Sequence, residues 1–275
     1  MCLLAVLSRV HPDAPLVVAA NRDEFFNRPA TPMTVLQDGD LRILGGRDEL
    51  AGGTWLAVND AGVVAGLTNR PNPAGRDMSK RSRGELPLLL AGHRSAAAAV
   101  EDFATRIRPS DYNPAWLLVG DRDSLYALDL TGDDIVGVDH LAPGLHVLEN
   151  RPYHDPSPKV DRIRALLEPA ISWRGDDLLI NLGRVLSDHE RPADQSPDDG
   201  ETARRPETLA ACVHSEDYGT RSASIVVVPV DPAQPPRVQF GDGPLCANPR
   251  QDASGLWSEA ALSALDQLGL NMTPN

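Results

Sequence analysis

The order of strand-like and helix-like segments constrains the fold more than any other feature of the sequence. Short apolar runs bounded by turn residues predict strands, and longer Leu- and Ala-rich runs with helical spacing predict helices. The predicted strands cover residues 3–10, 15–20, 41–44, 54–58, 63–67, 116–119, 124–130, 135–138, 145–148, 222–230 and 238–240. The predicted helices cover residues 84–93, 95–108, 159–170, 176–186 and 255–268. Blocks of strands that alternate with helix pairs favour an α+β layered architecture over a doubly wound sheet.

The chain is expected to form one domain. A length of 275 residues is sufficient for one large core, and nothing in the sequence demands two, so we expect a single domain over residues 1–275. Residues 188–207 interrupt the pattern with many Pro, Asp, Ser and Arg residues. Such a segment buries little apolar surface, which predicts an exposed loop. The sequence does not predict an oligomeric state.

Charge and composition narrow the classes of partner. The net charge of −13 argues against nucleic acid and against an anionic membrane surface. No apolar run reaches the ~18 residues of a membrane span, and the apolar opening at residues 2–7 is too short for a signal peptide. A reducing cytoplasm is the simplest location for a chain with three cysteines and no disulfide pattern. We therefore expect a cytoplasmic protein without a membrane span.

Cysteine and histidine spacing predicts no metal. Cys2, Cys212 and Cys246 show no CxxC pair and no regular spacing, which indicates neither a disulfide framework nor a structural zinc site. The seven histidines are scattered and include no HExxH motif. The chain also lacks the GxGxxG, GxxxxGK[ST] and GxSxG motifs. We expect neither a metal nor a cofactor.

Cys2 lies where a thiol can become the first side chain of a processed protein. An initiator methionine is normally removed before a small residue, and a free α-amine with a pKa of about 7.7–8 can accept the thiol proton. The run Asn21-Arg22-Asp23-Glu24 follows about one hairpin later. A guanidinium favours thiolate, and a carboxylate can hold the ammonium form of the amine. The alternative is that Cys2 packs as a small hydrophobic residue in a strand.

Other segments bring polar groups to predicted strand ends. Gly52-Gly53-Thr54-Trp55 combines a glycine pair with an aromatic side chain that can wall an apolar pocket, whereas ordinary turn chemistry is the reading favoured for these glycines and for Gly45-Gly46. Asn69 ends one predicted strand and can lie beside Cys2. Asn150 ends another, and its amide can donate to an oxyanion. Arg221 either faces a cavity or a carboxylate, or it reaches solvent.

These motifs occur in the order seen in the NRDE family, which is the family of transport and Golgi organisation protein 2. The resemblance spans nearly the whole chain and rests on the segments Cys2, Asn21-Arg22-Asp23-Glu24, Gly52-Gly53-Thr54-Trp55, Gly66-Leu67-Thr68-Asn69-Arg70, Glu149-Asn150 and Tyr218-Gly219-Thr220-Arg221-Ser222. The family resembles the N-terminal nucleophile hydrolases, especially the choloylglycine hydrolase and penicillin V acylase branch. That likeness implies a four-layer αββα sandwich. The chain departs from the family at Ser157-Pro158-Lys159, where a Trp often precedes the lysine, and at Ser222-Ala223-Ser224.

The resemblance also implies roles for individual residues. Cys2 matches the nucleophile, and the residues implied to act with it are Arg22, Asp23, Asn69, Asn150 and Arg221. The residues implied to contact substrate are Asn21, Glu24, Trp55 and Tyr218. The resemblance suggests a cysteine-dependent hydrolase of amides or acyl thioesters. The alternative is a non-catalytic protein of lipid homeostasis or haem trafficking that binds haem, a lipid or acyl-coenzyme A, because fold alone does not establish function.

Overall fold

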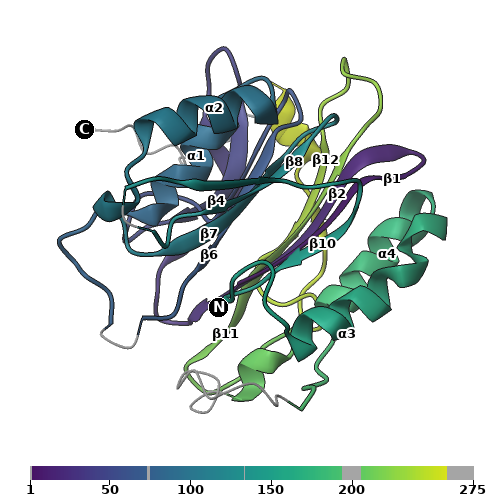
Figure 1. Cartoon of the computed structure of the whole chain (residues 1–275). Coiled ribbons are helices and arrows are strands. Elements are labelled where there is room, and N and C mark those ends of the chain that lie inside the picture. Colours follow the sequence, from purple (N-terminus) through teal and green to yellow (C-terminus); the bar gives the residue numbers. More distant parts are fainter. Residues whose placement is uncertain (1, 73–74, 133, 194–205, 259–275) are drawn as a thin grey trace, which may run out of the picture.

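The computed structural model describes residues 2–72, 75–132, 134–193 and 206–258, and it shows four stacked layers (Figure 1). One antiparallel sheet has the order β10 (Gly144–Leu148), β1 (Cys2–His11), β2 (Ala14–Phe25), β11 (Tyr218–Val228), β12 (Arg237–Gly241) and β13 (Gln251–Asp252). The other has the order β3 (Ala30–Gln37), β4 (Ile43–Asp48), β5 (Leu56–Asn59), β6 (Val64–Asn69), β7 (Ala115–Gly120), β8 (Leu125–Asp129) and β9 (Gly137–His140).

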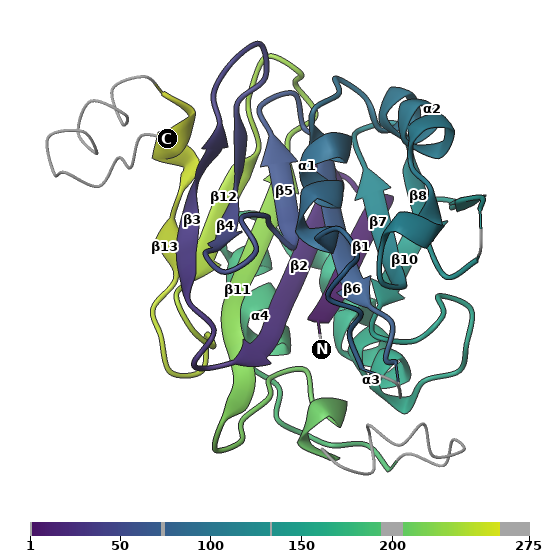
Figure 2. The ribbon, with the colours of Figure 1, turned by 90° about the vertical axis from the view of Figure 1, so that its left-hand side faces the viewer.

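Two pairs of helices form the outer layers. Helices α1 (Leu86–Ala91) and α2 (Ala96–Arg106) cover the β3–β9 sheet, whereas α3 (Pro158–Leu167) and α4 (Gly175–Leu186) cover the sheet that contains β1 and β2 (Figures 1 and 2). Ser95 caps α2, as its position predicts, by accepting a hydrogen bond from the backbone N–H of Ala98. No helix in the described ranges has the length and apolar character required to cross a membrane. The predicted α+β architecture, a four-layer αββα sandwich, is confirmed.

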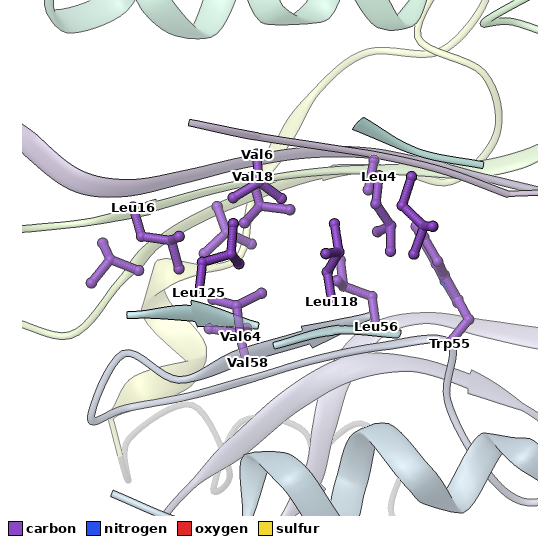
Figure 3. Packing of buried hydrophobic residues seen from close by; sticks show 14 of the residues in the cluster. Leu4, Val6, Leu16, Val18, Trp55, Leu56, Val58, Val64, Leu118 and Leu125 are labelled. Atoms are coloured by element: carbon purple, nitrogen blue, oxygen red, sulfur yellow. The ribbon is translucent and has the colours of Figure 1, made fainter. Parts of the chain in front are cut away.

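Side-chain alternation along β1 separates two of the cores. Leu4 and Val6 point between the sheets, where they pack with Leu56 and Leu118 of the facing sheet (Figure 3). The alternate residues Leu3, Ala5 and Leu7 point to the other face, where they pack against α3 and α4. A third core lies between the β3–β9 sheet and α1 and α2. Strand side chains alternate with a period of two, so β1 contributes to a core on each face, and it is continuously apolar from Cys2 to Leu7.

Several boundaries differ from the sequence prediction. β3 was not predicted, because its side chains are only partly buried and give no apolar run. Gly45 and Gly46, expected in a turn, lie within β4, where they pair with Thr34 and Met33. The predicted strand at 15–20 continues to Phe25 and the one at 222–230 starts at Tyr218, since neighbouring strands satisfy the backbone groups of these polar residues.

Two predicted elements lie partly beyond the residues that the structure describes. Of the predicted helix at 255–268, the described part forms the 3₁₀ turn Ser254–Trp257, and residues 259–275 lie outside the description. Of the predicted loop at 188–207, residues 194–205 are likewise outside it. A further 3₁₀ turn, Pro206–Leu209, follows.

A close approach of two glycines joins the GGTW segment to the start of the α1 region. A Cβ atom on Gly53 would lie 2.4 Å from the carbonyl carbon of Gly84. The backbone N–H of Thr54 donates to the carbonyl of Gly84 over 2.8 Å. A side chain at residue 53 would therefore separate the two backbones and break this contact.

We expect Gly53→Ala to lower the free energy of unfolding by about 1–3 kcal/mol, because the added methyl group overlaps backbone atoms that have no free space. Gly39→Ala is the matched control, since a Cβ at Gly39 meets nothing within 4 Å. Its stability should change by no more than about 0.5 kcal/mol. Urea denaturation of the two variants measures the difference, and equal stabilities would contradict the close approach.

Candidate active site

Strand register brings Cys2 and the NRDE run together. Cys2, the first residue of β1, lies opposite Arg22 in β2. On the other side of β2, Asp23 lies opposite Thr220 in β11. Cys2 points into the core between the sheets and is only 6% exposed. The three adjacent strands therefore place a buried thiol, a guanidinium and a carboxylate at one end of the sheet.

Asn150 holds the backbone nitrogen of Cys2. The Asn150 Oδ1 atom accepts a hydrogen bond from the Cys2 nitrogen over 2.7 Å. The Nδ2 group of the same side chain donates to the backbone carbonyl of Asn69, at the end of β6 in the other sheet. Both ends of the Asn150 amide are thus engaged, and the side chain links the two sheets at Cys2.

The surroundings of Cys2 favour the protonated thiol. Burial raises the pKa of the thiol, and the Asp23 carboxylate raises it as well. The Arg22 guanidinium and the backbone N–H of Asp23 act in the opposite direction, but they do not offset the burial. At neutral pH the thiol keeps its proton, so a nucleophilic Cys2 requires a nearby base.

Asp23 is itself buried, and its partners offset only part of the cost of burying its charge. Burial raises the pKa of the Asp23 carboxyl, and the Lys159 ammonium is the largest influence that lowers it. The Thr220 hydroxyl donates to Asp23 Oδ1 over 2.7 Å. Lys159 lies in the first turn of α3, is 1% exposed and donates from Nζ to the carbonyl of Thr208 over 3.0 Å. Lys159 and Thr220 are site residues that sequence reasoning missed, although the family motif contains the lysine.

Arg221 occupies an irregularity in β11. The pairing with β2 shifts between Thr220 and Ser222, so that Arg221 is the extra residue of a bulge. Bulges redirect a side chain out of the regular alternation. Arg221 lies 3.4 Å from Asp242 and lines a pocket together with Arg22 and Trp55.

This pocket is nearly closed by ion pairs. Arg22 lies 3.1 Å from Asp48 and 3.5 Å from Glu24, and Arg28 lies 2.6 Å from the same Asp48 oxygen. As the side chains lie, the pocket has ≈ 20 Å³ of space, about enough for one water molecule. Cys2 does not line it. Arg22, which lies opposite Cys2 in β2 and lines the pocket, connects the pocket with the thiol.

Besides Arg22, a further arginine lies near the thiol: Arg83, which the sequence analysis did not single out. Burial lowers the pKa of Arg83 to about 10, and the nearby Arg76 guanidinium acts in the same direction. The Cys2 thiolate and Glu24 raise it. Arg83 donates to the carbonyl of Pro114 over 2.9 Å. It lies beside Gly84, and nothing in its sequence context distinguishes it from other arginines.

Two of the residues implied to contact substrate have structural contacts instead of an open surface. Asn21 is fully buried and donates from Nδ2 to the carbonyls of Leu186 and Ala211, each over 2.8 Å. Tyr218 donates from its hydroxyl to the backbone carbonyl of Asp23 over 3.1 Å. Both support the strands that carry the site. The structure thus groups Cys2 with Arg22, Asp23, Asn69 and Asn150, and it places Arg221 and Trp55 on the adjoining pocket.

Known proteins share both sequence and fold with this chain. A sequence model of the family described as Transport and Golgi organisation 2 matches residues 1–234. The Transport and Golgi organization protein 2 homolog of Bos taurus is 30% identical over 241 residues, which cover 78% of this chain and 83% of that protein. The homolog of Homo sapiens is 29% identical over 236 residues, which cover 78% and 83% of the two chains.

Solved structures with little sequence identity have the same fold. The C2A mutant of conjugated bile acid hydrolase from Clostridium perfringens superposes with a TM-score of 0.53 at 12% identity and covers 93% of both chains. The Caenorhabditis elegans ortholog of N-acylethanolamine-hydrolyzing acid amidase superposes with a TM-score of 0.51 at 13% identity, covering 85% of this chain and 94% of that one. At such identities the likeness shows the fold, which is of the N-terminal nucleophile hydrolase type.

We expect the rate of Cys2 alkylation by iodoacetamide to rise with pH around a midpoint above the ordinary thiol value of about 8.5, because burial raises the pKa of this thiol. Arg22→Ala should move the midpoint upward, since it removes a cation that lowers the pKa, whereas Arg22→Lys should stay near wild type. Mass spectrometry of the peptide that ends at Arg9 follows Cys2 alone. An unchanged or lower midpoint in Arg22→Ala would show that the guanidinium does not act on the thiol.

Proposed function

The chain belongs to the Transport and Golgi organisation 2 family, and we propose that it is a cysteine-dependent hydrolase of linear amides or acyl thioesters with Cys2 as the nucleophile. The observation that carries the proposal is the hydrogen bond between the Cys2 nitrogen and Asn150 Oδ1. A backbone nitrogen of an ordinary strand residue pairs with the neighbouring strand, whereas here a side chain from a loop receives it. That arrangement suits a nitrogen that becomes a terminal amine.

Removal of Met1 supplies the base that the buried thiol lacks. The Cys2 nitrogen then becomes an α-amine with an ordinary pKa of about 7.7–8. Asn150 Oδ1 accepts one N–H of this amine and orients the nitrogen lone pair, which can receive the thiol proton. Asp23, buried and hydrogen-bonded by Thr220, stabilises the ammonium that results.

The reaction then follows the usual balance of acyl transfer. The Cys2 sulfur attacks the acyl carbon while its proton passes to the α-amine. The tetrahedral intermediate collapses to a thioester, and the ammonium returns the proton to the leaving amine or thiol. Water attacks the thioester with the amine as base, which releases the acid and restores the Cys2 thiol.

Asn69 is the better candidate for stabilising the oxyanion. The Nδ2 group of Asn150 is already used by the backbone carbonyl of Asn69. The Asn69 side chain, at the end of β6, has no hydrogen bond with any other described residue. Its amide is therefore free to donate to the developing oxyanion, while Asn150 orients the nucleophile.

Arg22 and Arg221 favour a substrate with an anionic part. Both line the pocket beside Trp55, and their carboxylate partners are Asp48 and Asp242. When a substrate carboxylate or phosphate displaces these partners, Asp48 keeps its ion pair with Arg28 and the half-exposed Asp242 is left to solvent. The two solved structures of similar fold are named as a hydrolase of conjugated bile acids and an amidase, which agrees with an acyl substrate.

A second candidate function is the binding of haem, a lipid or acyl-coenzyme A without turnover, in a cytoplasmic trafficking or lipid-homeostasis role. The observation that favours it is that Arg22 and Arg221 line the pocket whereas Cys2 does not. Binding of an anionic ligand there requires neither a free amine nor a reactive thiol. The two functions therefore differ in their dependence on Cys2.

We expect the intact mass of the protein purified from its native host to be lower than the encoded mass by one methionine, because the small Cys2 side chain permits removal of Met1. Intact-mass spectrometry measures this directly. The peptide that ends at Arg9 provides an internal check, since it should begin at Cys2. Full retention of Met1 would remove the proposed base and favour the binding function.

We expect Cys2→Ser to slow hydrolysis on the order of 10²-fold or more, because a hydroxyl is a much weaker nucleophile than a thiol near pH 7. Asn69→Ala should lower kcat by about 10²–10³-fold. Arg221→Ala should mainly raise KM. Release from a panel of N-acyl amides, lactams and acyl thioesters is followed by mass spectrometry.

Arg237→Ala is the matched control for Arg221→Ala. Arg237 also forms an ion pair with an aspartate, Asp176, at 3.1 Å, but it does not line the pocket. This variant should leave both kinetic constants unchanged. Equal background release by wild type and Cys2→Ser, together with tight retention of haem or acyl-coenzyme A, would reject the hydrolase in favour of the binding function.

A further inference from the structure

Two cysteines and two histidines from three segments meet beside the start of β11. His189 follows α4, Cys212 and His214 lie in the segment that leads into β11, and Cys246 lies in the turn after β12. One ligand atom from each of the four side chains lies within 4.8 Å of all the others. These four residues are called the His/Cys cluster below.

The three distances among Cys212, Cys246 and His214 match the edges of a tetrahedron around one metal ion. The two sulfur atoms of Cys212 and Cys246 are 3.7 Å apart. The Nε2 atom of His214 is 3.5 Å from the Cys212 sulfur and 3.3 Å from the Cys246 sulfur. With Zn–S bonds of about 2.3 Å and Zn–N bonds of about 2.0–2.1 Å, tetrahedral geometry requires about 3.8 Å between sulfurs and about 3.5 Å between sulfur and nitrogen.

His189 is prepared to supply the fourth ligand. Its Nδ1 atom lies 3.3 Å from the carbonyl of Cys212, which can only accept a hydrogen bond. Nδ1 must therefore carry the proton, so the lone pair of the neutral ring is on Nε2. Ligating histidines commonly donate their other ring nitrogen to a backbone carbonyl in this way.

The segments that carry the cluster are held together by other contacts. The backbone N–H of Cys212 donates to the carbonyl of Asp188 over 2.8 Å, and Asp188 accepts two hydrogen bonds from Arg162. His214 pairs with Gly219 in an isolated antiparallel bridge. Ligands on such backbone need little rearrangement to bind an ion, which lowers the cost of ordering them.

We propose that His189, Cys212, His214 and Cys246 bind one Zn²⁺ ion in a closed, structural site. Two thiolates and two imidazoles form a ligand set that selects Zn²⁺ over Mg²⁺ and Ca²⁺. Four protein ligands leave no position for a water molecule, so the ion would have a structural role and would take no part in acyl transfer.

The site would stabilise the segment that positions Asp23. Val213 lies between two of the ligands, and its backbone N–H donates to the Thr220 hydroxyl oxygen over 2.9 Å. The same hydroxyl donates to Asp23 Oδ1 over 2.7 Å. A metal bound by Cys212 and His214, on either side of Val213, would therefore help to hold Thr220, which donates to Asp23, in place.

Metal content of the full chain tests the proposal. The protein is produced without a histidine tag in zinc-containing medium and kept reduced, and zinc is measured by inductively coupled plasma mass spectrometry. Wild type should hold about one zinc per chain, and Cys246→Ser and His214→Ala should lose most of it. Cys2→Ser and His154→Ala are the matched controls, because they remove a thiol and an exposed imidazole outside the cluster. Both should retain the zinc of wild type.

Metal reconstitution of the wild-type protein provides a second test that does not depend on the folding of the variants. Reduced wild-type protein is stripped with a chelator and titrated with Co²⁺ alone, which should give the intense visible absorption of tetrahedral cobalt with thiolate ligands at about one equivalent. Wild-type protein that holds no zinc and gives no such absorption would overturn the proposal. A Cys212–Cys246 disulfide that persists in reductant, or zinc retained by both cluster variants, would overturn it as well.

Discussion

The antiparallel pairing of β1 with β2 is the interaction on which the candidate site depends. Its register sets Cys2 opposite Arg22 and carries the remainder of the NRDE run along the same strand. A slip of one residue would turn every side chain of β1 to the opposite face and move Cys2 from the inter-sheet core to the helix side. Both faces of β1 are buried, so each alternative register would expose apolar side chains to the wrong layer. Packing of the core therefore fixes the register, and the register determines which side chains lie next to Cys2.

Strand alternation also explains how a run of polar residues is accommodated inside the sandwich. Arg22 points between the sheets toward Asp48, whereas Asn21 and Asp23 point to the helix side. On that side Asn21 donates to two backbone carbonyls and Asp23 faces the buried Lys159. Asn21, Arg22 and Asp23 each have at least one partner from an element distant in sequence. These contacts meet only part of the hydrogen-bonding capacity of the run, because Asn21 Oδ1 and Arg22 Nη1 are buried without a hydrogen-bond partner among the described residues.

The order of strands and helices could be predicted from the sequence, because apolar periodicity depends only on residues close together in the chain. The layered architecture and the helix pairs could be predicted, and so could the N-cap at Ser95. The strand β3 could not, since its side chains are at most partly buried and form no apolar run. The length of β2 was underestimated because Asn21, Asp23 and Glu24 have low strand propensity, and pairing with β11 keeps this part of the chain extended.

Contacts between distant segments limited what could be inferred about the site. Predicted strand ends and motif order grouped Cys2 with Asn69 and Asn150, and the structure joins them through one amide side chain. Lys159 was seen only as part of a motif, because its effect on Asp23 arises from burial in the packed fold. The His/Cys cluster is drawn from three segments and has no short ligand spacing apart from Cys212 and His214. Spacing rules therefore predicted no metal site, whereas the tertiary structure assembles a complete ligand set.

Burial makes the thiol and its carboxylate interdependent. Burial raises the pKa of both groups, and Arg22 lowers the pKa of both. The Lys159 ammonium also lowers the pKa of Asp23 and so favours the charged carboxylate. The Asp23 carboxylate in turn opposes ionisation of the Cys2 thiol. A thiolate formed in advance would be repelled by Asp23, whereas transfer of the proton to an adjacent amine creates a cation that Asp23 attracts. In the proposed reaction, this charge arrangement favours proton transfer concerted with attack over a stable thiolate, and the Thr220 hydroxyl supports it through its hydrogen bond to Asp23.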